Sequence, residues 1–282
     1  MMVLPMVHRI LLTRRSFARG CALALTLPVL SPPVSNAQPP ASAGPPDPKL
    51  IEDLVAANRI LAAEAVVDAY GHVSARHSRN PDRYLLSRSL APELVTPADI
   101  LEFDLDSNAV DARGLPLYLE RFIHGEIYRA RPDVKAVVHC HTPSLIPFGV
   151  TGIPLQPVVG LGGFIAEGVP VFDTRKFAGM TDLLVRNPAL GRALAQTLGN
   201  KPAALMRGHG AAVVGPSLPQ AVGRSVYLAL NARLQAQAMA LGGKITYLDP
   251  AEAKQANADG FQRAWELWKQ RAMPKYSTSE AR

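Results

Sequence analysis

The chain has 282 residues, of which 48% are hydrophobic and 19% charged, enough for one sizeable core with a short appendage. Its formal charge of +7 is concentrated early: residues 1–37 carry four arginines and no acidic residue, which leaves 26 basic against 23 acidic residues elsewhere. That balance gives no reason to expect nucleic-acid binding. Only one of the two cysteines, Cys140, lies beyond residue 37, so an intramolecular disulfide and a cysteine-rich metal cluster are both excluded there.

The first forty residues are typical of an export signal. Arg14 and Arg15 precede an apolar run, Gly20–Leu30, that is too short to span a bilayer comfortably as a helix. The tripeptide Ser35–Ala37 offers the small residues that a signal peptidase reads. The pattern resembles a twin-arginine signal, so we expect residues 1–37 to be a signal peptide and the mature protein to be periplasmic. The alternative is an uncleaved membrane anchor; otherwise the protein meets the membrane only during export.

Three further regions follow the predicted signal. Residues 38–48 (QPPASAGPPDP) are predicted to be a linker without packing potential, residues 49–275 a folded domain and residues 276–282 a tail. Within the domain, apolar residues at helical spacing predict an opening helix over 49–68. Two strands follow, at Tyr84–Leu86 after an Asn-Pro-Asp turn and at residues 100–105, where apolar and acidic residues alternate.

The second half of the domain continues to alternate helices with short strands. The patterns predict an amphipathic helix over 118–130, a buried strand over 136–141, a short strand over 169–172, two strands or one bulged strand over 203–206 and 211–214, and helices over 219–241 and 251–271. This order indicates a layered α/β domain.

Three histidines and one glutamate suggest a metal site. His139 and His141 are two apart on a predicted strand, so their side chains leave the same face, and His209 lies between glycines that let the backbone turn sharply. Three neutral imidazoles with an open fourth position suit catalytic zinc, manganese or iron. Glu120 and His124 share one helical face, and a carboxylate beside a metal can bind it or act as acid or base. The alternative is that the strand histidines are ordinary surface residues.

The order of these residues resembles that of the class II aldolase/adducin family. Glu120 and His124 are followed by Arg131-Pro132-Asp133, by Val137–His141 and by Gly208-His209-Gly210, and the resemblance runs from about residue 50 to residue 248. It implies a three-layer α/β/α domain with a mixed, mainly antiparallel central sheet, and a homotetramer with active sites near the subunit interfaces. It places the metal ligands at His139, His141 and His209 and the catalytic glutamate at Glu120.

The chain departs from the sugar-phosphate aldolases of this family at three places. Gly71–Arg76 resembles the family's Gly-Asn-Val-Ser-x-Arg loop, with His72 in place of asparagine. The two serines that precede the glutamate in those aldolases are replaced by Tyr118 and Leu119. Residues 142–182 contain no tyrosine that would serve as the usual catalytic tyrosine. These departures argue against phosphate binding and against ordinary aldol protonation.

This combination of motifs is similar to that of decarboxylases of the family that act on hydroxylated aromatic carboxylates, including pyridine dicarboxylates. It joins Gly-His-Val-Ser-x-Arg with Leu-Leu-Ser-Arg-Ser at residues 85–89. We therefore expect Arg76 and Arg88 to bind carboxylates of the substrate through bidentate hydrogen bonds, with Ser74 and Ser87 beside them. The alternative for each arginine is an intramolecular salt bridge.

Together these expectations predict that the protein is a metal-dependent carbon–carbon lyase with one divalent metal ion per chain. It is predicted to decarboxylate a small hydroxylated aromatic carboxylate through a metal-stabilised enolate, with Glu120 as proton donor and His72 or His124 as helper. One alternative is an aldolase or retro-aldolase acting on a non-phosphorylated hydroxy-keto acid. Another is a binding or scaffold protein with the same fold and no turnover.

The export signal makes the first testable prediction. Replacing both Arg14 and Arg15 by lysine keeps the charge but removes the paired arginines that the twin-arginine route recognises. Fractionation of the cells should then show uncleaved precursor in the cytoplasm, whereas the wild-type chain should be cleaved near Ala37. Normal export of the double variant would contradict the prediction.

Overall fold

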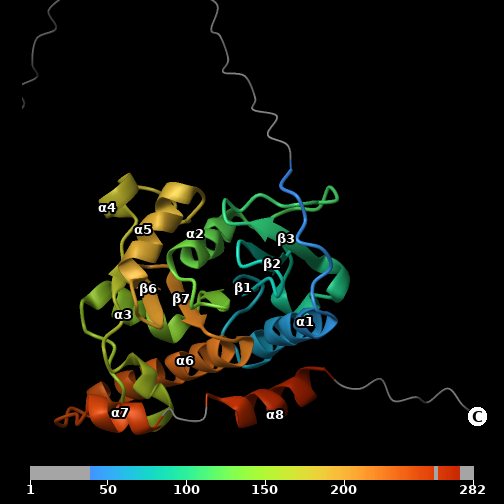
Figure 1. The fold of residues 1–282 in the computed structure, drawn as a ribbon. Helices are drawn as coiled ribbons and strands as arrows, with labels where there is room; N and C mark the ends of the chain where they lie inside the picture. The colour runs from blue at the N-terminus through green and yellow to red at the C-terminus, as the bar shows by residue number, and fades with distance from the viewer. Residues whose placement is uncertain (1–38, 257–259, 274–282) are drawn as a thin grey trace, which may run out of the picture. The chain divides into compact units, whose positions relative to one another are not determined.

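A computed structural model describes the fold of residues 39–256 and 260–273 (Figure 1). The predicted signal peptide (residues 1–37) and the predicted tail (276–282) lie outside the described residues, so both stay predictions.

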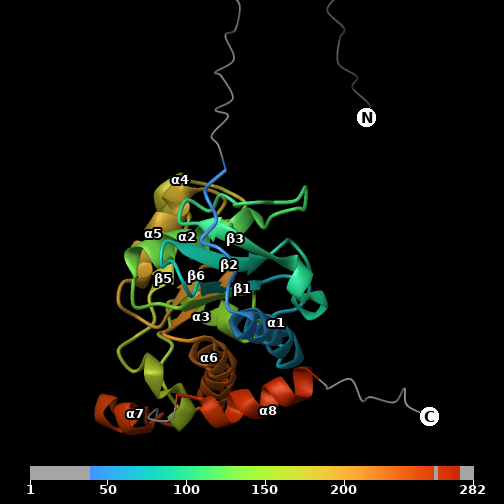
Figure 2. The ribbon, with the colours of Figure 1, turned by 45° about the vertical axis from the view of Figure 1, so that its right-hand side comes forward.

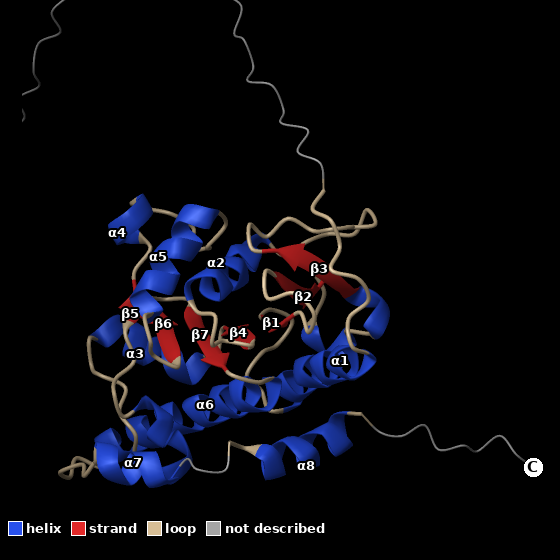
Figure 3. Ribbon diagram, viewed as in Figure 1, coloured by secondary structure: helices blue, strands red, loops and turns tan. Residues whose placement is uncertain are grey.

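A seven-stranded sheet forms the centre of the domain, in the order β3-β2-β1-β4-β7-β6-β5 (Figure 3). The strands are β1 (His72–Arg76), β2 (Arg83–Ser87), β3 (Ile100–Asp104), β4 (Ala136–Cys140), β5 (Val171–Phe172), β6 (Ala203–Met206) and β7 (Gly210–Gly215). Neighbouring strands are antiparallel except β5 and β6, which are parallel. The mixed, mainly antiparallel sheet is therefore confirmed.

Helices cover both faces of the sheet, as Figures 1 and 2 show. On one face α1 (Pro48–Ala63), α6 (Leu218–Ala240) and α8 (Gln262–Ala272) enclose one core, and on the other α2 (Phe122–Ala130) and α5 (Pro188–Leu198) enclose a second. Because successive strand residues point to opposite faces, Val137 belongs to the second core and Val138 to the first. The three-layer α/β/α architecture is confirmed.

The smaller helices lie in the connections. They are α3 (Ile146–Thr151), α4 (Arg175–Ala178), α7 (Pro250–Ala256) and the 3₁₀ helices η1 (Pro92–Leu94), η2 (Pro97–Asp99), η3 (Leu119–Arg121), η4 (Pro143–Leu145) and η5 (Gly160–Ile165). In the described part of the chain, no helix combines the length and the apolar character needed to cross a bilayer.

Three elements differ from the sequence-based expectation. The opening helix ends at Ala63 rather than at residue 68, because Ala65 adopts a left-handed backbone (φ 54°) and the following valines turn into the core. The final helix is two helices, since Gly260 and Phe261 both have positive φ. The segment that resembles a family loop, Gly71–Arg76, is mostly strand β1.

The predicted linker also makes specific contacts. The Ser42 hydroxyl and the Ala43 N–H donate to the Glu102 carboxylate, over 2.6 and 2.7 Å. The Arg83 guanidinium donates to the Ala41 carbonyl over 3.0 Å. The prediction missed these contacts because they use backbone and polar atoms, whereas packing potential was judged from apolar side chains. This part of the segment is held against β2 and β3 before α1 begins.

Candidate active site

The pairing of strands brings the three predicted metal ligands together. His139 lies on β4 opposite Ala212 of β7, and His141 follows directly after the end of β4. His209 lies in the turn between β6 and β7. A Cβ atom on Gly210 would lie 1.9 Å from the Cys140 carbonyl oxygen, so the turn can approach β4 this closely only with glycine there.

Glu120, in the 3₁₀ helix before α2, completes a compact cluster with these histidines. The Nε2 atom of His141 lies 3.0 Å from Nε2 of His139 and 3.0 Å from Nε2 of His209. The Oε2 atom of Glu120 lies 3.3 Å from His139 Nε2 and 3.4 Å from His209 Nε2. Tetrahedral metal–ligand bonds of ~2.0–2.1 Å place ligand atoms roughly 3.3 Å apart. The four side chains therefore fit a site for one metal ion.

Backbone carbonyls orient two of the imidazoles. The Nδ1 atom of His139 lies 3.1 Å from the Ala211 carbonyl oxygen, and Nδ1 of His209 lies 3.1 Å from that of Leu183. An Nδ1–H that donates to a carbonyl leaves the Nε2 lone pair free and aimed at the centre of the cluster. The rings are thus held in the form that binds a metal.

The segment Leu183–Val185 supports two members of the cluster at once. It accepts from His209 through the Leu183 carbonyl, and the Val185 N–H donates to Glu120 Oε1 over 2.9 Å. Leu183 has a φ of 70°, a left-handed conformation that is strained for a leucine. Sequence reasoning missed this segment, because nothing marks a leucine in advance as the residue that takes such a backbone.

Electrostatics favour an ionised Glu120. Burial alone would raise the pKa of its carboxyl group, but the facing imidazoles of His139 and His209 outweigh burial and lower that pKa below its usual value. Burial, followed by the neighbouring His139 and His209, lowers the pKa of His141 to about 4. At neutral pH the cluster therefore offers a carboxylate and a neutral His141, the protonation states in which these groups bind metals.

The two other predicted catalytic residues lie beside the cluster. His72 on β1 is directly opposite His139 on β4, and its Nδ1 atom is 2.6 Å from Nε2 of His124 on α2. The Nδ1 atom of His124 is in turn 2.6 Å from the Ser74 hydroxyl oxygen. His72 borders a pocket, whereas His124 lies behind it and is fully buried.

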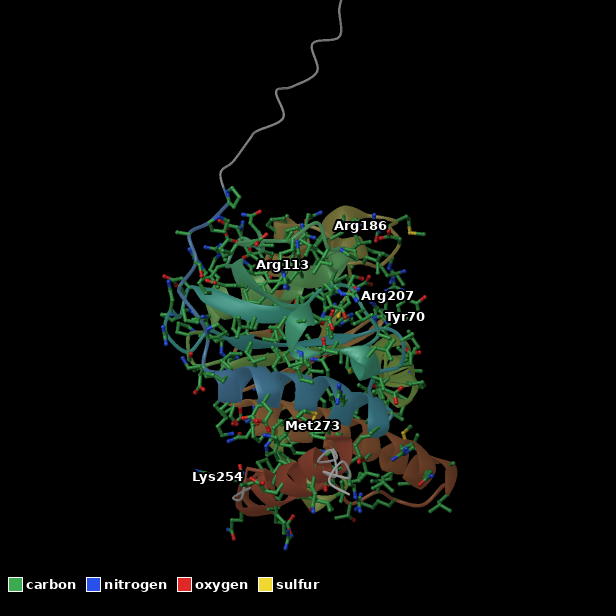
Figure 4. The ribbon with its side chains drawn as sticks, turned by 90° about the vertical axis from the view of Figure 1, so that its right-hand side faces the viewer. Tyr70, Arg113, Arg186, Arg207, Lys254 and Met273 are labelled. Carbon is green, nitrogen blue, oxygen red and sulfur yellow. The ribbon has the colours of Figure 1, made fainter. Side chains whose placement is uncertain are left out.

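The cluster opens into a pocket of about 360 Å³. Its lining combines Glu120, His139, His141 and His72 with mainly apolar walls, formed by Ala69, Tyr70, Gly71, Ser89, Leu90, Ala91, Tyr118, Leu119 and Leu184. Tyr70, labelled in Figure 4, is 67% exposed. No lysine or arginine of the described chain lines this pocket. The arrangement can bind a ligand that has a metal-chelating edge and an uncharged, flat body.

The structure gives the predicted substrate-binding arginines other contacts. The Arg76 guanidinium is buried and donates to the backbone carbonyls of Pro81, Tyr128, Arg131 and Val134. The Arg88 Nε–H donates to the Asp99 carboxylate over 2.7 Å. Neither arginine lines the pocket, so the alternative of an intramolecular role describes both better.

The predicted serines also lie outside the pocket lining. Ser74 is fully buried behind His72, and the Ser87 hydroxyl lies 3.5 Å from the Tyr118 hydroxyl. The side chains that replace them at the pocket wall are those of Ser89, the last residue of the Leu-Leu-Ser-Arg-Ser motif, and of Leu90, which no motif in the sequence singled out. Ser74 shares a face of β1 with His72 but lies two residues further along the strand, where its hydroxyl contacts His124 of α2 instead of the pocket.

Comparisons with known proteins agree with this site. The family described as "Class II Aldolase and Adducin N-terminal domain" matches residues 52–236. Decarboxylase tropJ of Talaromyces stipitatus is 35% identical over 77% of this chain and 92% of that protein. The 3,4-dihydroxyphthalate decarboxylase of Arthrobacter keyseri is 31% identical over 71% of this chain and 83% of that protein. A solved structure of an aldolase II superfamily protein from Pseudomonas syringae has the same fold, with a TM-score of 0.68. The two proteins are 23% identical, and the match covers 79% of this chain and 92% of that one.

His209 provides a test of the metal site. His209→Ala removes one of three converging imidazoles, and two remaining imidazoles should bind a divalent ion far more weakly. Elemental analysis of the purified variant should show loss of metal, with a circular dichroism spectrum close to that of the wild type. His77→Ala, which removes a buried histidine outside the cluster, is the matched control and should keep its metal. Full metal content in His209→Ala would remove His209 from the site.

Arg76 provides a test that separates a structural from a substrate-binding role. Arg76→Lys cannot satisfy the four carbonyls that the guanidinium now binds, so thermal or urea unfolding should show a loss of about 2–4 kcal/mol. KM should stay unchanged at a temperature where the variant is folded. The exposed Arg79→Lys change is the control, with no expected loss of stability. A raised KM with unchanged stability would restore the substrate role of Arg76.

Proposed function

The chain belongs to the class II aldolase/adducin family, and from that membership we propose that it is a metal-dependent lyase that decarboxylates a hydroxylated aromatic carboxylate. One observation carries the proposal. The cluster of Glu120 and three histidines opens into a pocket with aromatic and aliphatic walls and, among the described residues, no lysine or arginine. A sugar phosphate would place its dianion in this pocket without a cation to pair with it.

The walls of the pocket suit a flat ring. Tyr118 packs against His72, with ring centroids 4.4 Å apart and the ring planes tilted by 45°, and its hydroxyl donates to the Leu90 carbonyl, so this wall is held in place from both sides. Leu119 and Leu184 add apolar surface. The two named relatives are a decarboxylase and a dihydroxyphthalate decarboxylase, which supports a substrate with a hydroxyl group next to a carboxylate.

His139, His141 and His209 would hold one divalent ion (zinc, manganese or iron), with the Glu120 carboxylate beside it. When bound, the ion supplies positive charge beside the substrate oxygens and so stabilises the negative charge that develops as the carbon–carbon bond breaks. The cluster supports this assignment because its lone pairs converge and its two oriented imidazoles donate their other N–H groups to carbonyls.

Glu120 would move the proton that the reaction needs. As an ionised carboxylate it first accepts a proton from the substrate hydroxyl at Oε2, while Oε1 stays bound to the Val185 N–H. Glu120 then gives this proton to the ring carbon that bears the carboxylate and becomes a carboxylate again. The carbon–carboxylate bond breaks, carbon dioxide leaves, and the electron pair of that bond restores the aromatic ring as a phenolate, which balances the step. His72 would support it from the neighbouring strand.

Two further parts of the proposal concern where and in which assembly the reaction occurs. The twin arginines support export, so we place the enzyme in the periplasm. A homotetramer with sites near its interfaces is supported by two apolar side chains that line the pocket and stay exposed in the single chain, Tyr70 at 67% and Leu119 at 56%. A second subunit would cover them.

The same site leaves an aldolase as the second candidate, because aldol cleavage also produces a carbanion beside a metal-bound group. Metal analysis, followed by a screen of hydroxylated aromatic carboxylates that begins with monocarboxylates and includes 3,4-dihydroxyphthalate, separates the candidates. Carbon dioxide release with one-to-one loss of substrate supports the decarboxylase. Release of an aldehyde or keto acid without carbon dioxide supports the aldolase. A protein with neither metal nor turnover would be a scaffold.

Glu120→Gln tests the catalytic role of the carboxylate. Glutamine keeps the size of the side chain and the oxygen that accepts from Val185, but it has no ionisable group. Turnover should fall by about a hundredfold or more, the usual scale for losing general acid–base catalysis, with a much smaller change in KM.

The metal content of the same variant distinguishes the two roles that the geometry allows. Retained metal with low turnover makes Glu120 chiefly a proton carrier, whereas lost metal makes it an essential fourth ligand. Glu126→Gln is the matched control, since Glu126 is a buried glutamate of α2 that lies outside the pocket. Near-normal turnover of Glu120→Gln on the true substrate would contradict a catalytic role.

A further inference from the structure

A buried chain of hydrogen bonds runs from the pocket into the core between the sheet and α2. It begins at His72, passes through His124 and Ser74, and ends at Tyr128. The three links measure 2.6, 2.6 and 2.8 Å, and no member is more than 3% exposed. The sequence pattern pointed to the two histidines and Ser74 but not to Tyr128, and the proposed function uses only His72.

Tyr128, at the buried end of this series of hydrogen bonds, determines which group donates in each of them. Burial raises the pKa of the Tyr128 phenol above its usual range, so the phenol keeps its proton at neutral pH. Its oxygen receives a hydrogen bond from the Val137 backbone, and its other partner is the Ser74 hydroxyl. A buried O–H group must donate to an acceptor. Tyr128 therefore donates to Ser74.

The direction of the hydrogen bond between Tyr128 and Ser74 then determines the direction of the other two. Ser74 accepts from Tyr128, so its own proton goes to Nδ1 of His124. Burial lowers the pKa of His124 to about 3, so this imidazole is neutral and carries its single proton on Nε2. That proton is donated to Nδ1 of His72. Because Nδ1 of His72 is the acceptor in this bond, it carries no proton, and the ring proton of His72 must be on Nε2.

We infer that Tyr128 and Ser74 are positioning residues that hold His72 in its Nε2–H form, so that His72 acts in the pocket as a hydrogen-bond donor and not as a base. Nε2 of His72 has no hydrogen-bond partner among the described residues, and the ring borders the pocket between Tyr118 and His139. An N–H group there can donate to the substrate oxygen on which negative charge develops. Only the identity of that oxygen rests on the proposed function.

The opposite direction would leave a buried group without a partner. A proton on Nδ1 of His72 would require His124 to donate to Ser74 and Ser74 to donate to Tyr128. The phenol O–H would then have no acceptor among its described contacts, which is unfavourable in the core. Because the Tyr128 side chain is closed off from solvent, water cannot supply the missing acceptor from outside.

Nitrogen-15 NMR of the zinc-loaded protein, without substrate, tests the inference directly. The two ring nitrogens of a neutral histidine have well-separated shifts, so the spectrum of histidine-labelled protein reports which nitrogen carries the proton. In the wild type His72 should show only the Nε2–H form, assigned by its loss in His72→Asn. In Tyr128→Phe the Nδ1–H form should appear as well. A wild-type His72 in the Nδ1–H form would overturn the inference.

Two matched comparisons separate the direction of the chain from a change in packing. Tyr84→Phe removes a buried hydroxyl beside Tyr128 that binds Ser107 and not the chain, and it should leave the His72 signal unchanged. Ser74→Thr and Ser74→Val have the same shape and differ by one hydroxyl. The threonine variant should keep the Nε2–H form and the valine variant should lose it. The inference would be overturned if the threonine and valine variants gave identical His72 signals and Tyr128→Phe gave the wild-type signal. If Tyr128→Phe folds poorly, the comparison of the two Ser74 variants still decides.

Turnover gives a second readout that a packing role would not move in the same way. With a hydroxylated aromatic carboxylate that the wild type decarboxylates, kcat of Tyr128→Phe should fall by about tenfold while KM stays within about twofold, the usual scale for residues that orient a group beside a metal site. Unchanged kcat would overturn the role of Tyr128. A wild type with the Nε2–H form but no decarboxylation would refute the proposed function and leave the inference standing.

Discussion

The antiparallel pairing of β4 with both β1 and β7 is the constraint on which the site depends. It places His139 opposite His72 on one side and opposite Ala212 on the other, so the two groups of imidazoles meet across neighbouring strands. Because the side-chain period of a strand is two, a shift of one residue in either register would turn these rings to the opposite face and into the other core. The central strands are completely buried on both faces, and this burial fixes the register.

Burial and charge oppose each other within the site. A buried carboxylate is unfavourable unless neighbouring groups stabilise it, and Glu120 obtains this stabilisation from two imidazoles and from the Val185 N–H. The same peptide segment holds His209 through a leucine in a left-handed conformation. Local strain at Leu183 is therefore compensated by contacts to two residues of the cluster, and the segment couples the position of Glu120 to that of His209.

The sequence was informative where chemistry and periodicity coincide. The strand at Ala136–Cys140 and the grouping of Glu120 with the three histidines both follow from spacing together with the family resemblance. The contacts of Arg76 could not be predicted, because its partners are backbone carbonyls of loops whose path depends on the whole fold. The prediction of one continuous final helix failed for a similar reason. Phe261, just before α8, takes a left-handed backbone that its residue type disfavours.

The placement of the arginines changes how selectivity is explained. If Arg76 and Arg88 bound substrate, the pocket would select a second anionic group by attraction. The structure instead commits both guanidinium groups to the protein and lines the pocket with Tyr118, Leu119 and Leu184. An apolar wall discriminates by the desolvation cost of burying a charge. Under the proposed function, selectivity would then lie in rejecting a second charged group, and recognition of the carboxylate would fall to the cluster of Glu120 and the three histidines and to the donor that His72 presents.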